Sequence, residues 1–182
     1  MTSDVERARE GDRDAYERLA IGAADRLFQV AHRIVRDIDL ANDAVQQTLV
    51  AMWTDLPTLR DPDRFEAWSY RLVVRFSLAD ARRHRRSGIT IHALTDDVPE
   101  PRAGIDGVDD RDELDRAFRE LSPEHRAVLV LHHYLGLPLT EIAVVLGVPY
   151  GTVGSRLHRA TDQLRAVLEA GARTASMEGV PA

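Results

Sequence analysis

Residues 139–160 have the pattern of two short helices on either side of a tight turn. Ile142 and Leu146 recur at a helical interval, and Gly147 follows, which can adopt the positive φ angle that a helix stop needs. Pro149 suits the first position of a second helix, where a missing N–H costs nothing. This pattern predicts a helix-turn-helix.

The second helix of this unit carries polar and basic side chains on the side opposite its apolar residues Val153 and Leu157. When such a unit enters a major groove, the N-terminal part of the second helix reaches base edges and phosphates. The residues that we expect to contact DNA are Tyr150, Thr152, Ser155, Arg156 and Arg159. A helical hairpin that only packs is the alternative, because short helix pairs are common.

Length and composition limit the chain to one domain or two small ones. It has 182 residues, of which 44% are hydrophobic, and strand signals are few. No apolar run approaches the roughly 20 residues of a membrane span, the N-terminus lacks the apolar stretch of a signal peptide, and there is no cysteine for a disulfide or a thiolate metal site. We therefore expect an all-α, cytoplasmic protein without membrane insertion.

Charge is distributed unevenly along the chain, whose net charge is −6. Residues 87–115 contain nine acidic residues and two arginines, whereas residues 1–86 contain 15 of each. The segment 87–110 also contains Gly and Pro without helical periodicity, which is typical of a flexible linker. The sequence therefore predicts two helical domains, at 1–86 and 111–170, joined by an acidic linker and followed by a short tail from 171 to 182.

The N-terminal domain is expected to contain three amphipathic helices, at about residues 15–36, 40–56 and 64–86. Four arginines of the third helix fall within roughly 60° of one another at about 100° per residue. Such a row is an electrostatic footprint for phosphate, although a solvated helix end is the alternative. The expected DNA-contacting residues are Arg71, Arg75, Arg82 and Arg86 in this row, with Arg83 and Arg85 beside them.

The aromatic residues of this domain also have two interpretations. Trp53 and Trp68 are expected in the hydrophobic core, because most aromatic residues at helical spacing lie there. Stacking on the bases of opened DNA is the alternative for aromatic residues beside the arginine row.

Patterns of catalytic chemistry are missing from the sequence. His132 and His133 are adjacent, so on a helix they point about 100° apart and cannot form the i, i+4 pair of a metal-binding helix. There is no Gly-rich phosphate loop and no Gly-x-Ser-x-Gly motif. We expect a protein that is not an enzyme and has no metal or cofactor.

Four further motifs precede the helix-turn-helix in a fixed order. They are Gly11-Asp-Arg-Asp-Ala-Tyr-Glu-Arg-Leu19, Asp43-Ala-Val-Gln-Gln-Thr-Leu49, Phe65-Glu-Ala-Trp-Ser-Tyr-Arg71 and Leu121-Ser-Pro-Glu-His-Arg-Ala-Val-Leu-Val-Leu131. With them, the chain resembles a bacterial RNA polymerase sigma factor of the extracytoplasmic-function (ECF) type over about residues 11–168. All 24 basic residues are arginine, which indicates a GC-rich and, within this family, actinobacterial source.

The resemblance implies a promoter-specificity subunit, with sigma region 2 at 1–86 and sigma region 4 at 111–170. It implies that core RNA polymerase binds the second helix through the clamp helices of its largest subunit. The implied contacts there are Asp43, Gln46, Gln47 and Thr48, which fall largely off the apolar side of that helix. The third helix would melt and read the minus-ten element of promoter DNA, and the helix from Pro149 would read the minus-thirty-five element. An anti-sigma factor that holds both domains is a further implied partner.

Three features depart from the family pattern. Many relatives have Gln-Glu-Thr-Phe where this chain has Gln46-Gln47-Thr48-Leu49. Arg75 occupies the position of a common base-capturing Asn, and Gly154 occupies one that is often basic. Two other functions therefore stay open. One is a polymerase-independent regulator that uses only the helix-turn-helix, and the other is a degenerate relative that acts only as an interaction protein.

Overall fold

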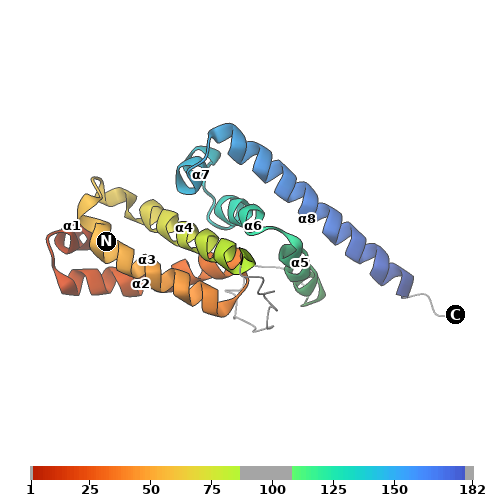
Figure 1. Ribbon diagram of the computed structural model, residues 1–182, viewed down its shortest axis with the longest axis horizontal. Helices are drawn as coiled ribbons and strands as arrows, with labels where there is room; N and C mark the ends of the chain where they lie inside the picture. The colour runs from red at the N-terminus through yellow and green to blue at the C-terminus, as the bar shows by residue number, and fades with distance from the viewer. Residues whose placement is uncertain (1, 87–107, 179–182) are drawn as a thin grey trace.

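The computed structural model describes residues 2–86 and 108–178, and these residues form helices and short turns without any strand. The expected all-α fold is confirmed. Figure 1 shows α1 to α4 packed together in one half of the molecule and α5 to α8 in the other. The helices are α1 (Thr2–Arg9), α2 (Arg13–Val35), α3 (Ile38–Asp55), α4 (Phe65–Arg86), α5 (Val108–Glu120), α6 (Pro123–Leu129), α7 (Leu139–Leu146) and α8 (Tyr150–Glu178).

The N-terminal domain is built on α2, α3 and α4, each of which contacts the other two. Their apolar sides meet in a core that includes the fully buried Leu27, Met52 and Phe65. Aspartates cap two of these helices. The carboxylate of Asp12 accepts a hydrogen bond from Ala15 N at 3.0 Å, and that of Asp37 accepts one from Leu40 N at 2.8 Å.

In the C-terminal domain, α5, α6 and α7 pack along one side of the long helix α8 (Figure 1). Gly147 ends α7 with a φ of 66°, as the helix-turn-helix pattern predicts. Ile142 and Val153 on either side of the turn are fully buried. Helix α8 begins at Tyr150, so Pro149 precedes the helix instead of opening it, and its carbonyl accepts hydrogen bonds from Thr152 N and Val153 N.

Two helices extend into the segments that the sequence predicts as linker and tail. Helix α5 begins at Val108, inside the segment 87–110, and α8 continues to Glu178, inside the segment 171–182. The remainder of both segments lies outside the described residues. In the described part of the chain, no helix has the length and apolar character needed to cross a membrane.

The two domains are docked on each other. Helix α4 contacts α6 and α7, and α2 contacts α6. Within residues 2–86 and 108–178, ion pairs cross the boundary from Arg36 to Asp115 at 2.7 Å and from Arg82 to Glu124 at 3.2 Å. The guanidinium of Arg33 also lies 4.0 Å from the centre of the Tyr134 ring. The docked arrangement therefore uses specific charged contacts as well as apolar packing.

Candidate nucleic-acid interface

Helix α4 presents two buried sides. Phe65 and Leu72 face the core of the N-terminal domain. Tyr70, Val74 and Ala81 recur on a second side and are buried as well. Tyr70 lines a cleft shared with α7, and Ala81 lines a cavity shared with α6. This second side therefore faces the C-terminal domain.

The third side of α4 carries the arginines. All six that the sequence predicts to contact DNA are exposed, namely Arg71, Arg75, Arg82, Arg83, Arg85 and Arg86. The guanidinium of Arg75 lies 4.8 Å from the centre of the Phe76 ring. Near the C-terminal end of the helix, Arg82 pairs with Glu124 at 3.2 Å and Arg83 with Asp80 at 3.3 Å. Arginines near the end of the helix thus form ion pairs within the protein, and all six remain accessible to solvent.

The partner of Arg82 has a perturbed titration. Burial raises the pKa of Glu124, but a backbone N–H, the hydrogen bond from Arg82 and the charges of Arg82 and Arg85 outweigh it. The net effect is a pKa below the usual value of 4.5. Glu124 is therefore ionised at neutral pH and holds an arginine that is predicted to contact DNA.

The predicted reading residues of the helix-turn-helix all lie in the first three turns of α8. Tyr150, Ser155 and Arg159 are exposed, whereas Thr152 and Arg156 are half-buried. The hydroxyl of Ser155 donates to the carbonyl of Thr152 at 3.1 Å. The structure places these five side chains on one accessible end of the helix.

The predicted polymerase contacts on α3 do not share one environment. Asp43 and Gln46 are exposed, and Gln47 donates from Nε2 to Oδ2 of the buried Asp80 at 2.9 Å. The expectation that Thr48 lies off the apolar side is wrong, since it is fully buried and its hydroxyl donates to the carbonyl of Ala44 at 2.7 Å. Thr48 is buried because α3 contacts both α2 and α4, so that the buried surface of α3 extends beyond its apolar residues.

Two apolar residues of α3 that sequence reasoning did not place on the surface are exposed on the same side as Gln46. Val50, four residues after Gln46, is 65% exposed, and Trp53, three residues after Val50, is 39% exposed. The expectation that Trp53 belongs to the core is therefore only half right, since one edge packs on Tyr16 with ring centres 4.8 Å apart. Trp68 is half-buried against Phe65. An apolar residue at i+4 from a polar contact candidate is the signal that could have found Val50.

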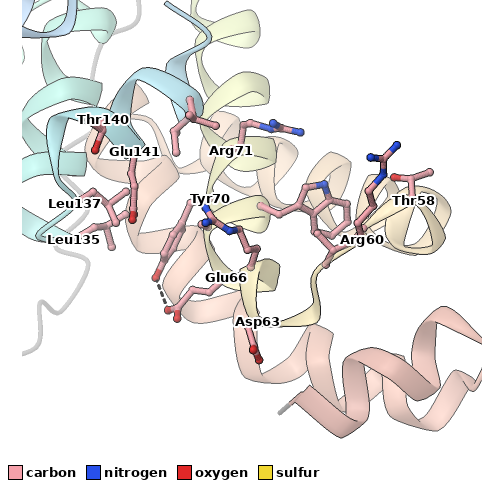
Figure 2. A pocket seen from close by; sticks show the side chains of 16 residues that line it. Thr58, Arg60, Asp63, Glu66, Tyr70, Arg71, Leu135, Leu137, Thr140 and Glu141 are labelled. Carbon is pink, nitrogen blue, oxygen red and sulfur yellow. Dashed lines mark hydrogen bonds between the residues drawn. The ribbon is translucent and has the colours of Figure 1, made fainter. Parts of the chain in front are cut away.

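A cleft of about 890 Å³ lies beside the contact between α4 and α7 and is lined by residues of both helices. Figure 2 shows Glu66, Tyr70 and Arg71 on one wall and Leu137 and Glu141 on the other. The hydroxyl of Tyr70 donates to Glu66 at 3.1 Å. Burial, and next the charge of Glu66, raises the pKa of Tyr70 to about 12. The cleft is thus lined by both polar and apolar residues, which come from both domains.

Family models match both halves of the chain. The model described as Sigma-70 region 2 matches residues 22–87, and the model described as Sigma-70, region 4 matches residues 111–164. The ECF RNA polymerase sigma factor SigL of Mycobacterium tuberculosis is 35% identical over 148 residues, which cover 79% of this chain and 82% of SigL. The chain belongs to the ECF RNA polymerase sigma factors. Region 2 thus falls on α2 to α4, and region 4 on α5 to α8.

A further relative and two solved structures are similar to this chain. The ECF sigma factor SigE of Mycolicibacterium smegmatis is 34% identical over 83% of this chain, which spans 60% of the length of SigE. Among solved structures, CnrH in complex with the cytosolic domain of CnrY has a TM-score of 0.66 and 29% identity, with 93% of this chain and 97% of that one covered. The sigma factor RpoE from Bartonella quintana, in complex with the anti-sigma factor NepR, has a TM-score of 0.67 and shares the fold at 22% identity over 85% of this chain and 96% of its own.

Proposed function

We propose that this ECF sigma factor binds core RNA polymerase in the cytoplasm, directs it to a specific set of promoters, and is held inactive by an anti-sigma factor. It acts as a transcription initiation factor and not as an enzyme. The observation that carries the proposal is the presence of accessible arginines on both α4 and α8 in a chain with sigma regions 2 and 4.

The polymerase contact that we propose lies on the exposed side of α3. It consists of Asp43, Gln46, Val50 and Trp53, which together offer charge, an amide and apolar surface. Exposed aromatic and aliphatic residues next to polar ones are typical of protein interfaces. Gln47 contributes indirectly, because its hydrogen bond to Asp80 ties α3 to α4.

The DNA contacts that we propose are divided between the two domains. The arginines of α4 would neutralise phosphates around the minus-ten element, and each such contact makes affinity depend on salt. The first turns of α8 would read the minus-thirty-five element in the major groove, with Arg156 and Arg159 as the cationic residues there.

These two contacts require the domains to separate. The two promoter elements lie about 25 base pairs apart by position, which is roughly 85 Å at about 3.4 Å per base pair. A compact chain of this length has a radius of gyration of only about 16 Å. In the docked arrangement α4 touches α7, so the reading surfaces lie within one compact body. We infer that the docked form is inactive and that promoter binding needs an open form.

An anti-sigma factor would act by holding the docked form. Two similar solved structures are complexes, CnrH with the cytosolic domain of CnrY and RpoE with the anti-sigma factor NepR. By analogy, the partner of this chain would contact both domains at once and prevent their separation. The cleft between α4 and α7 is built by both domains and offers such a surface.

The test is promoter-dependent transcription with purified components. The full chain is added to core RNA polymerase from a GC-rich bacterium, with promoter fragments selected from that host's genomic DNA. We expect start sites that appear only with both components and vanish when Arg71, Arg82 and Arg156 are changed to Ala. A control with Arg13, Arg60 and Arg173 changed to Ala removes three exposed charges elsewhere and should keep the start sites.

The remaining outcomes favour the other two functions. Sequence-specific DNA binding without any effect of polymerase would support the polymerase-independent regulator. Neither DNA binding nor polymerase binding would support a protein that acts only through interactions. Loss of transcription in both triple variants would mean that total charge, and not the position of the arginines, is what matters.

A further inference from the structure

A second cavity, of about 490 Å³, lies at the other end of the domain boundary. The N-terminal domain contributes Val35, Ala81 and Arg85 to its lining. The C-terminal domain contributes Arg119, Arg126 and Gln163. Three arginines from two domains therefore line one cavity. Its volume is within the range of small-ligand sites.

Arg126 is the most unusual of these residues. It is only 7% exposed, and its Nε has no hydrogen-bond partner. Within the described part of the chain, its guanidinium makes a single hydrogen bond, a long one from Nη1 to the carbonyl of Phe118 at 3.5 Å. Among the described residues, no carboxylate forms an ion pair with it. A buried guanidinium without an anion is costly, so this side chain lacks a partner that its chemistry requires.

The neighbouring charges increase that cost. Burial, followed by the charges of Arg36 and Arg85, lowers the pKa of Arg126 to about 10, and Glu124 opposes this only weakly. The nearby carboxylates are engaged elsewhere, since Asp115 pairs with Arg36 and Glu124 pairs with Arg82. Glu120 is the only acidic residue among those that line the cavity in the described part of the chain. The site therefore carries an excess of positive charge.

We propose that this cavity is an anion site that binds a phosphate group, either as a free phosphate ion or as the terminal group of a nucleotide, through Arg85, Arg119 and Arg126. Guanidinium groups match the oxygens of phosphate with two parallel hydrogen bonds each. The amide of Gln163 is already used, since its oxygen accepts a hydrogen bond from His125 Nδ1 at 2.9 Å and its nitrogen donates to the carbonyl of Glu120. The arginines are thus the ligand-binding groups.

The position of the site gives it a consequence for the conformation of the protein. Its arginines come from both domains, so a phosphate group bridges them only while the domains are docked. A ligand that binds one of two conformations shifts the population toward that conformation. Phosphate binding would therefore favour the docked form and oppose the opening that promoter binding requires.

The experiment measures ligand binding directly on the full chain without polymerase, so its result is independent of the proposed promoter function. Inorganic phosphate, pyrophosphate and ATP are titrated by calorimetry at constant ionic strength, with sodium chloride as the matched blank. Arg85→Gln and Arg126→Gln are compared with Arg13→Gln, which removes an exposed charge at the opposite end of α2. Arg85 is exposed, so its variant folds even if the Arg126 variant does not.

We expect saturable binding to the natural chain and an increase in Kd of about 10- to 100-fold in the Arg85 and Arg126 variants. This follows from the loss of one charge-assisted hydrogen bond of about 1.5–3 kcal/mol, at about 1.4 kcal/mol per tenfold. Arg13→Gln should bind as the natural chain does. Pyrophosphate or phosphate binding more tightly than ATP identifies a free ion, and the reverse order identifies a nucleotide. An absence of binding, or equal Kd values in all variants, overturns the proposal.

Discussion

Arg36, at the end of α2, donates a hydrogen bond of 2.7 Å to Asp115 of α5 while holding a left-handed backbone conformation with φ of 60°. It is the one non-glycine residue with positive φ in the described part of the chain. A left-handed residue with a Cβ costs about 1 kcal/mol or more, and such strain persists where the surroundings maintain it. The side chain of Arg36 is 12% exposed, so the strained residue is also the one that reaches the other domain.

Replacing Arg36 separates its two effects. Arg36→Gly removes both the strain and the ion pair, whereas Arg36→Ala removes the ion pair alone. We expect both variants to open, seen as a larger radius of gyration by small-angle scattering. Since both tryptophans lie in the N-terminal domain, their fluorescence reports its unfolding. We expect Arg36→Gly to be more stable than Arg36→Ala by about 1 kcal/mol. Equal stability of Arg36→Gly and Arg36→Ala would show that the backbone of Arg36 is not strained. Variants that stay as compact as the natural chain would show that the ion pair does not hold the domains together.

Arg126 provides a stability prediction with a defined sign. Its guanidinium is buried without an anion, so Arg126→Met, which keeps a long side chain, should stabilise the docked form by about 1–4 kcal/mol in a phosphate-free buffer. The measurement is chemical unfolding of the full chain at pH 8. A less stable variant would mean that the contact with Phe118 matters more than the buried charge.

The stability difference between Arg126→Met and the natural chain should depend on pH, because burial lowers the pKa of Arg126. The pKa of Arg126 is lowered from its ordinary value to about 10 in the docked form. The penalty is therefore complete well below pH 10 and decreases as pH rises through about 10, where the docked form loses its proton before the unfolded chain does. The stability difference between Arg126→Met and the natural chain should be constant from pH 7 to 9 and smaller at pH 11. A stability difference that is larger at pH 11 than at pH 9 would contradict the inference that the buried charge of Arg126 destabilises the docked form.

The periodicity of apolar residues was sufficient to predict the helices, but it was not sufficient to predict which side chains are buried between them. The helix stop at Gly147 and the exposure of the α4 arginines both follow from spacing within one helix, and both were predicted. Thr48 was placed on the wrong side because periodicity measures apolarity, and a threonine whose hydroxyl bonds its own helix can be buried without loss. Trp53 was assigned to the core for the same reason, although part of its ring is exposed.

Docking of the two domains could not be predicted because no local pattern encodes it. Tyr70 and Ala81 lie on α4 between the core side and the arginine row, and from the sequence they are simply residues of an amphipathic helix. The partners of Arg36 and Arg82 lie 79 and 42 residues away along the chain. Pairing over such distances depends on tertiary structure, so the cavity around Arg126 was also outside the reach of the sequence.

Acidification should open the docked form through Glu124. Its pKa is lowered in the docked form, so the ion pair with Arg82 stabilises docking above pH 4.5 and is lost as pH falls through the lowered pKa. The pair is partly exposed, so its contribution is about 1 kcal/mol or less. We expect small-angle scattering to show opening of the natural chain as pH falls below 4.5. Glu124→Gln should already be more open at pH 7 and should change less with pH. Identical profiles would exclude this ion pair as a contributor.

The polymerase contact on α3 can be tested at Val50. Val50 is 65% exposed, so Val50→Asp should not change the unfolding midpoint, but a buried charge in an interface is costly. We expect the affinity for core RNA polymerase to fall at least about tenfold, measured by fluorescence anisotropy of the labelled sigma factor. Val50→Ile keeps an apolar side chain and is the matched control. Unchanged affinity in Val50→Asp would place the contact elsewhere on the N-terminal domain.

Gly154 allows helix stability and DNA affinity to be separated on the recognition helix. A Cβ added at this position meets no atom within 4 Å, so a side chain fits without rearrangement. Gly154→Ala should stabilise α8 by about 0.5–1 kcal/mol because glycine is a poor helix former. Gly154→Arg should have this effect and also add a cation near the phosphates, which steepens the dependence of log K on log salt by about 0.9. The measurement is binding of polymerase holoenzyme to a selected promoter fragment between 50 and 200 mM salt. If Ala and Arg give the same slope, residue 154 does not face the DNA backbone, and the reading side of α8 must then be centred on Tyr150 and Ser155.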